Sequence, residues 1–303
     1  MDTAALDVAC HLNVLVPGLE DPGLPAALDR LAELGYRRVV LPPLDPATAD
    51  PGALGRLFAG RGLGVITIAG QAPGADVSSD DPAVRRAGEQ SLRRVAEFTA
   101  EIGGDQMNGV PYGVFGHPRT PTTPAAFERA ASAVGAVADH AHALGVTMTF
   151  EVLNRYETSV VNTAEDALRF VAASGSEHLR IHLDTFHMAV EETDLNAAVV
   201  SALPRLGYLE LGQSGRGRLA DGVVDVPGVI RTALHHGYTG RLGVEAFSRS
   251  VLAPEVGDML AIWRSPWEDG LALAEEAKRI IDGACAEAGA GPQPPRCDRD
   301  DTV

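Results

Sequence analysis

Eight short apolar runs alternate along this chain with longer segments rich in Ala, Leu, Arg and Glu, and this alternation is the feature that most limits its fold. We interpret as strands the runs 8–16, 37–42, 64–69, 104–110, 146–152, 179–184, 206–212 and 241–247. The predicted helices are 23–35, 49–62, 81–102, 124–144, 163–174, 194–203, 226–237 and 267–288. Such alternation is typical of right-handed βαβ units on a parallel sheet. Eight units in a chain of this length predict an α/β fold closed into a (β/α)₈ or TIM barrel.

Length and composition fit one such domain followed by a tail. The chain has 303 residues, of which 45% are hydrophobic, and a barrel of this kind takes about 250 residues. Gly35, Gly145 and Gly237 each stand where a predicted helix should stop before a strand, a position that often needs a positive φ. We therefore predict a single barrel domain over residues 1–288. Residues 289–303 are rich in Gly, Pro and charge, which predicts a disordered tail.

The charge and the cysteines exclude several classes of protein. A formal net charge of −16 argues against a nucleic-acid partner and against an anionic membrane surface, because both require clustered Lys and Arg. Cys10, Cys285 and Cys297 lie far apart, which argues against a disulfide framework and a structural zinc site. The first residues show neither a basic segment nor a long apolar one. We expect a cytoplasmic protein on that ground.

Acidic side chains stand at the ends of four successive predicted strands. They are Glu151 in MTFEV, Asp184 in RIHLD, Glu210 in GYLEL and Glu245 in LGVEA. A barrel places its active site at the carboxyl ends of its strands. Unpaired carboxylates in apolar surroundings are costly and repel one another, and a divalent cation is the simplest compensation. The pattern predicts one divalent metal ion bound by these four acids.

Two further polar residues follow the candidate ligands closely. His187 comes three residues after Asp184, and Glu157 comes six residues after Glu151. Both fall in loops that follow strands, so both are expected above the barrel mouth. There they can contact a bound substrate.

At these residues the sequence resembles a known family. The segments FEVLNRYETSVVNT (150–163), IHLDTFHMAVEE (181–192) and LGYLELGQSGR (206–216) resemble the D-tagatose/D-psicose 3-epimerase family. That family belongs to the xylose-isomerase-like barrel superfamily. The resemblance continues through segments 66–88 and 244–264 and covers the chain from about residue 60 to 285.

The resemblance implies a set of functional residues. Those that match metal ligands are Glu151, Asp184 and Glu245. Glu151 and Glu245 also match the two acid/base carboxylates. The residues that match substrate-binding side chains are Glu157, His187 and Arg216. Members of the family bind Mn²⁺, Co²⁺ or Mg²⁺, epimerise free ketohexoses at C3, and are often homodimers or homotetramers.

The implied chemistry is the movement of a proton beside a ketone. A metal ion polarises the C2 carbonyl and the C3 hydroxyl of a small carbohydrate, which acidifies the C3 proton. One carboxylate removes that proton to leave an enediolate, and the other returns a proton to the opposite face. Inversion at C3 requires two such groups on opposite sides of the planar intermediate.

The sequence departs from the family pattern around its seventh predicted strand. Glu210 stands where the family has a His ligand. Nearby, Tyr208 replaces an earlier His of the family pattern, Gln213 replaces a Glu, and Gly215 replaces an Asn. Four carboxylates bring −4 against +2, which weakens a metal ion as a Lewis acid and favours Mg²⁺ or Mn²⁺. Two further explanations of the change are open. His182 could supply an imidazole near the ion, or the substrate could be a modified sugar.

Residues that cover the sugar are less defined by the sequence. The segment NGVPYGVFGH (108–117) replaces the corresponding loop of the family, and within it Tyr112 and Phe115 are expected to line the pocket. His11, in the first predicted strand, faces either the barrel interior or the helices. The sequence alone does not decide between the two directions.

Other functions share parts of this pattern. An aldose–ketose isomerase uses the same enediolate and returns the proton to a different carbon. A metal-dependent lyase that cleaves C-glycosides has a similar barrel but needs a partner subunit. An endonuclease of the superfamily needs more His ligands and a basic face, which the charge of −16 opposes. A sugar-binding barrel without a metal is the non-catalytic alternative.

Overall fold

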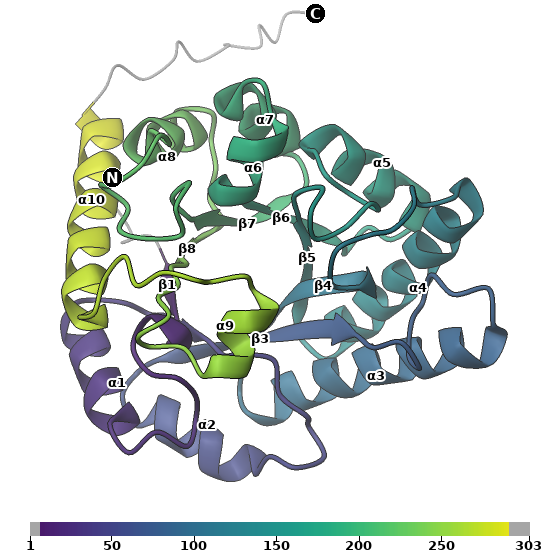
Figure 1. Ribbon diagram of the computed structural model, residues 1–303, viewed down its shortest axis with the longest axis horizontal. Coiled ribbons are helices and arrows are strands. Elements are labelled where there is room, and N and C mark those ends of the chain that lie inside the picture. Colours follow the sequence, from purple (N-terminus) through teal and green to yellow (C-terminus); the bar gives the residue numbers. More distant parts are fainter. Residues whose placement is uncertain (1–6, 291–303) are drawn as a thin grey trace, which may run out of the picture.

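Eight parallel strands form a closed barrel in the computed structural model, which describes residues 7–290. The strands pair in chain order, and β1 closes the barrel against β8 (Figure 1). Their bounds are β1 Val8–His11, β2 Arg38–Val40, β3 Gly64–Gln71, β4 Gln106–Val114, β5 Thr147–Val152, β6 Arg180–Asp184, β7 Leu206–Leu211 and β8 Arg241–Val244. The predicted (β/α)₈ barrel is confirmed. Most of the predicted tail, including Cys297, lies outside the described residues.

Helices surround the barrel, and α10 lies beside α1 and α8 (Figure 1). Their bounds are α1 Leu24–Glu33, α2 Pro51–Ala59, α3 Pro82–Glu101, α4 Pro124–Ala143, α5 Ala164–Ser174, α6 Thr185–Glu191, α7 Leu195–Ala202, α8 Val226–His235, α9 Pro254–Met259 and α10 Gly270–Ala290. Side-chain caps begin most of them, as Asp81 does by accepting from the amide of Ala83. None of these helices is long and apolar enough to cross a membrane.

The structure differs from the sequence prediction mainly near the barrel mouth. The predicted strand 8–16 ends at His11, and residues Leu12–Val14 form a short 3₁₀ helix. Two helices, α6 and α9, were not predicted; they lie in the connections that follow β6 and β8. α6 forms because the side chain of Asp184 caps it by accepting from the amide of Phe186. Short capped helices of this kind carry little apolar periodicity, so the sequence pattern missed them.

The fourth strand is longer than predicted, although it contains glycine. Gly109 has a φ of +116°, and a Cβ there would lie 2.2 Å from the carbonyl oxygen of Ala69. The pairing of β3 with β4 shifts register between Ala69 and Gln71. Gly109 therefore allows the close approach of the two strands at this irregularity, where a side chain would not fit.

Two apolar layers position the mouth. The larger layer fills the space between strands and helices. A smaller one lies inside the barrel and consists of Ala9, Val40, Ile66 and Tyr208. At the opposite end, Arg38 and Arg241 both pair with Asp7 and Asp105. The barrel is therefore filled and closed below the mouth, so that a ligand has access only at the carboxyl ends of the strands.

Candidate metal centre at the barrel mouth

The four predicted acids all lie at the carboxyl ends of their strands and are largely buried. Glu151 is in β5, Asp184 ends β6, Glu210 is in β7, and Glu245 follows the last residue of β8. Asp184 and Glu210 are opposite each other in the pairing of β6 with β7. Both are 0% exposed, and Glu245 is 7% exposed. Buried carboxylates at this density need cationic partners.

The acids do not gather into one four-carboxylate group in the described part of the chain. Their donor atoms instead join histidines in three groups, and the atoms of each group lie within 4.8 Å of one another. The groups are His11 with Glu210 and Glu245, Glu151 with Asp184 and His187, and Glu151 with His182 and Glu210. Three imidazoles therefore lie between the acids, and the mouth holds donors suited to a divalent ion.

Glu210 lies between two buried imidazoles. Its Oε1 is 2.8 Å from Nε2 of His11, and its Oε2 is 3.1 Å from Nε2 of His182. Burial by itself would raise the pKa of Glu210, but the charges of His11 and His182 hold it below its usual value. Glu210 is therefore an anion that faces two nitrogens from different strands.

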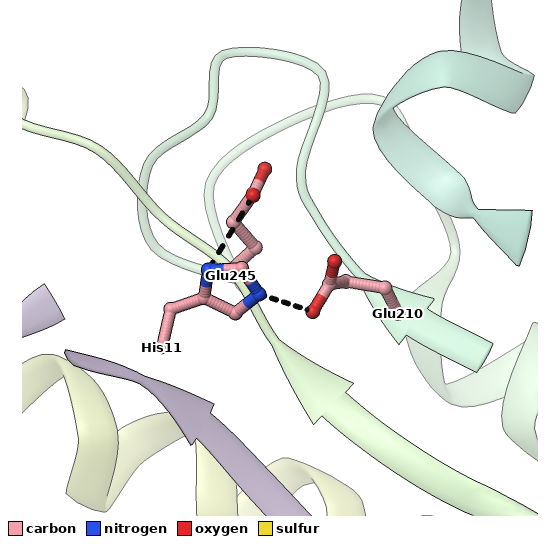
Figure 2. Close-up of side chains that lie close together, drawn as sticks. All are labelled: His11, Glu210 and Glu245. Atoms are coloured by element: carbon pink, nitrogen blue, oxygen red, sulfur yellow. Dashed lines mark ion pairs between the residues drawn. The ribbon is translucent and has the colours of Figure 1, made fainter. Parts of the chain in front are cut away.

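The direction of His11, open in the sequence, is decided by barrel closure. β1 pairs with β8 so that Cys10 is opposite Val244, which places His11 level with Glu245. The imidazole points into the mouth, toward Glu210 on one side and Glu245 on the other (Figure 2). The first strand is buried at every residue, so its sequence shows no alternation that would reveal this direction.

The other half of the centre contains Glu151, Asp184 and His187. Nε2 of His187 lies 3.3 Å from Oε1 of Glu151 and 3.7 Å from Oδ2 of Asp184. Burial and the neighbouring acids Glu245 and Glu210 raise the pKa of Asp184 well above its usual value. Burial would also raise the pKa of Glu151, but the charges of His182 and His187 lower it. A cation beside Asp184 would relieve both the cost of burying its charge and the repulsion from its neighbours.

Arg216 is the cation of the site and has a strained backbone. Its Nη2 donates to Oε2 of Glu245 at 2.7 Å, and its Nη1 is 3.6 Å from Oε1 of Glu157. The guanidinium lies between the rings of Phe186 and Phe247. Arg216 has a φ of +52°, a conformation that costs about 1–3 kcal/mol in a residue other than glycine. The loop after β7 thus holds a buried charge at the mouth at some cost in backbone energy.

A pocket of about 280 Å³ opens above this arginine. Glu157, Arg216, Phe186 and Phe247 line it, and the exposed ring of Trp263 lies at its edge. Its size is close to the lower end of the range for small-molecule sites, about 300–1,000 Å³. The predicted substrate residues Glu157 and Arg216 are thus together in a pocket, with His187 beside Glu157 at 4.0 Å.

Tyr112 lies elsewhere. Its ring is 0% exposed and packs edge-on against Phe150 and Phe170, in the layer between strands and helices. Its hydroxyl donates to the backbone carbonyl of Glu151. This position does not fit the predicted contact with a substrate, because the side chain leaves β4 on the helix side of the sheet. Phe115 packs against the edge of the same layer.

Several buried donor atoms in the described residues lack a hydrogen-bond partner. Among them, at the mouth, are Oδ2 of Asp184, both carboxylate oxygens of Glu210, and Nε2 of His11, His182 and His187. Buried polar atoms are normally hydrogen-bonded, and each exception needs an explanation. Oxygen and nitrogen donors that point into a shared space without hydrogen bonds fit a divalent cation.

Gly243 gives Glu210 the room it needs, and replacing it tests the packing of the centre. A Cβ at Gly243 would lie 2.1 Å from the hydroxyl of Tyr208 and 2.7 Å from Oε1 of Glu210. Gly243→Ala is expected to lower the free energy of unfolding by about 1–3 kcal/mol through overpacking, measured by urea unfolding. Gly283→Ala is the control, because nothing lies within 4 Å of its added methyl in α10. Equal stability of the two variants would contradict the packing described here.

The raised pKa of a buried histidine predicts how the stability of the metal-free protein changes with pH. Burial would lower the pKa of His11, but Glu210, Glu245 and Glu151 raise it from 6.5 to about 9. The folded protein therefore holds this proton more tightly than the unfolded chain does. The resulting stabilisation is complete below pH 6.5 and is lost as the pH rises through 9. It amounts to about 3 kcal/mol at roughly 1.4 kcal/mol per pKa unit.

Urea unfolding in the presence of a chelator, at intervals from pH 6 to 10, measures this loss. His182 acts in the same direction, since Glu151 and Glu210 raise its pKa against the effect of burial. His11→Gln is expected to make the profile flatter. A variant with the same pH profile as the unmodified protein would assign the effect to another group.

Comparison with known proteins agrees with the barrel fold. A family model described as xylose isomerase-like TIM barrel matches residues 28–277. The chain belongs to this family. Membership in the xylose isomerase-like TIM barrel family agrees with the single barrel domain.

Relatives within this family are named as epimerases of ketoses. The chain is 36% identical over 276 residues to a ketose 3-epimerase of Arthrobacter globiformis, covering 91% of this chain and 96% of the relative. It is 34% identical to an L-ribulose 3-epimerase of Mesorhizobium japonicum, with coverage of 85% and 87%. A solved structure of L-ribulose 3-epimerase superposes with a TM-score of 0.88 at 32% identity, covering 94% of this chain and 96% of that one.

Proposed function

We propose that this protein is a metal-dependent isomerase that epimerises a ketose at C3 through an enediolate. The observation that supports it most directly is the position of Glu151 and Glu245. They face the mouth from β5 and from the end of β8, three strands apart around the barrel, and each lies in a donor group with a histidine. Two carboxylates that approach from different sides are what inversion at a carbon requires.

The ligands that we propose for the ion are Glu151, Asp184, Glu210 and Glu245, because Glu151 and Glu210 are each shared by two of the three donor groups and so join the four acids into one centre. When bound, a divalent ion such as Mn²⁺, Mg²⁺ or Co²⁺ polarises the ketone and stabilises the negative charge of the enediolate. Three buried oxygens support this set, because they lack hydrogen bonds among the described residues: Oδ2 of Asp184 and both carboxylate oxygens of Glu210.

The chain's own side chains perform the remaining tasks. Glu151 and Glu245 transfer the C3 proton on opposite faces of the sugar. Arg216, which donates to Glu245, positions that carboxylate and reaches the pocket in which Glu157 also lies. His187, within 4.0 Å of both Glu151 and Glu157, is positioned to bind a sugar hydroxyl. Epimerases named for L-ribulose and D-psicose among the relatives indicate a free ketose as substrate.

Metal analysis followed by deuterium exchange tests the proposal. Purified protein is expected to contain a bound divalent ion, measured by elemental analysis. In D₂O it is expected to introduce deuterium at C3 of L-ribulose, D-allulose or another ketose, detected by NMR. Keto-glycosides belong in the same panel, because they test the modified-sugar alternative. Bound metal without exchange into any free ketose would refute the proposed substrate class. The cytoplasmic location and the homodimeric or homotetrameric state stay predictions from the sequence.

A further inference from the structure

His11 has no role in the function proposed above, yet its imidazole lies inside the donor centre. Ala9, two residues earlier on β1, lies in the barrel interior with Tyr208. Side chains two residues apart on a strand share a face, so His11 also faces inward, one layer higher. It is 6% exposed and lies between Glu210 and Glu245 (Figure 2).

The contacts of this imidazole differ from those of an ordinary buried histidine. Its Nε2 is 2.8 Å from Oε1 of Glu210, and its Nδ1 is 3.6 Å from Oε1 of Glu245. The short contact is an ion pair when His11 is protonated, but it lacks the geometry of a hydrogen bond, since Nε2 of His11 and both oxygens of Glu210 have no hydrogen-bond partner within residues 7–290. Neighbouring ligands of one ion show this arrangement. Two bonds of about 2.1 Å at a right angle put the ligand atoms roughly 3 Å apart.

The charge of the centre favours a neutral ligand on this side. Glu151, Asp184, Glu210 and Glu245 bring −4 against the +2 of one ion, so a further carboxylate would add repulsion. A neutral imidazole adds a donor without adding charge. The group of His11, Glu210 and Glu245, whose donor atoms lie within 4.8 Å of one another, places such a neutral donor beside two of the four carboxylates.

We propose that His11 is a nitrogen ligand of the divalent ion in this chain, bound beside Glu210 and Glu245. The inference rests on the metal centre of the proposed function and makes β1 part of that centre. It also bears on the choice of metal. A nitrogen ligand favours a transition ion such as Mn²⁺ or Co²⁺ over Mg²⁺, which prefers oxygen ligands only.

Pulsed electron paramagnetic resonance of the Mn²⁺-loaded protein tests this directly, because it detects the coupling of a bound nitrogen to the metal. The unmodified protein is expected to show the coupling of one imidazole ¹⁴N, and His11→Gln is expected to lose it. Titration with Mn²⁺ is expected to show a dissociation constant at least about 10-fold higher in His11→Gln. His182→Gln is the matched control, since His182 is also buried and contacts the other oxygen of Glu210.

Each result has a defined meaning. A nitrogen coupling kept in His11→Gln but lost in His182→Gln would overturn the proposal and assign the ligand to His182. Bound Mn²⁺ with no nitrogen coupling would overturn it in favour of an all-oxygen site. If His11→Gln does not fold, the double variant His182→Gln/His187→Gln takes its place, because His11 is then the remaining imidazole of the three donor groups. Loss of the coupling in that variant would overturn the proposal.

The test separates this inference from the proposed function. A His11-dependent nitrogen coupling without deuterium exchange into ketoses would refute the epimerase and leave the ligand assignment standing. Deuterium exchange by a protein whose Mn²⁺ has no nitrogen ligand would support the epimerase and refute the ligand assignment. Failure to bind Mn²⁺ at all would overturn both.

Discussion

Glu151→Gln and Glu245→Gln are each expected to lower the rate of C3 epimerisation by about 10²–10⁴-fold, the usual contribution of a general acid or base. The amide cannot remove or return a proton, but it preserves the size of the side chain. Because the two carboxylates serve opposite faces of the sugar, each variant is expected to keep deuterium exchange with one C3 epimer and to lose it with the other. The two variants should keep opposite epimers. NMR of each purified epimer in D₂O measures this.

Glu97→Gln is the control for these variants. Glu97 pairs with His140 on the outside of the barrel, so this substitution is expected to leave both exchange rates unchanged. Variants at 151 and 245 that still exchange both epimers at the rate of Glu97→Gln would remove both residues from the reaction. Loss of exchange with the same epimer in both variants would contradict the placement of the two groups on opposite faces.

Arg216→Met is expected to lower the free energy of unfolding of the metal-free protein by about 3–5 kcal/mol, the usual effect of removing one partner from a buried ion pair. Methionine retains packing against Phe186 and Phe247, which flank the guanidinium. It leaves Glu245 and Glu157 without their cation. The positive φ of residue 216 is strained in both proteins, so the difference reports the lost charge. Urea unfolding in the presence of a chelator measures it.

Arg30→Met is the matched control, because Arg30 and its partner Glu33 are more than half exposed. An exposed ion pair contributes about 0–1 kcal/mol. A loss of stability in Arg216→Met no larger than that in Arg30→Met would show that Arg216 does not compensate the buried acids. Added Mn²⁺ is expected to restore part of the stability of Arg216→Met, since the ion supplies positive charge to the same carboxylates.

The sequence predicted the barrel well, because each βα unit carries its own apolar period and its own helix ends. All eight predicted strands begin within two residues of the observed strands, as the start of β7 at Leu206 illustrates. The acids at strand ends were recognisable for a related reason. Glu151 and Asp184 interrupt runs that are otherwise apolar, and a barrel sends every strand end to the same mouth.

The sequence was less informative where contacts join distant parts of the chain. Tyr112 was expected at the sugar but packs against Phe150 and Phe170, because β4 continues further than its glycines suggested. Arg216 combines a positive φ with a guanidinium that lies beside Glu245. Neither property has a local pattern, since each depends on neighbours from another strand.

The candidate centre shows most clearly which features the sequence determined and which only the tertiary structure decided. From the sequence alone, five acids and one histidine could be assigned to the mouth, and the family resemblance added an arginine, because motif and strand position are local properties. Which acid meets which imidazole was decided only when the barrel closed. That closure puts β1 beside β8 and brings His11, near the start of the chain, between Glu210 and Glu245. The nitrogen donor on the first strand reaches the mouth only through the pairing of β1 with β8. An entirely buried strand has no periodicity from which its direction could be predicted.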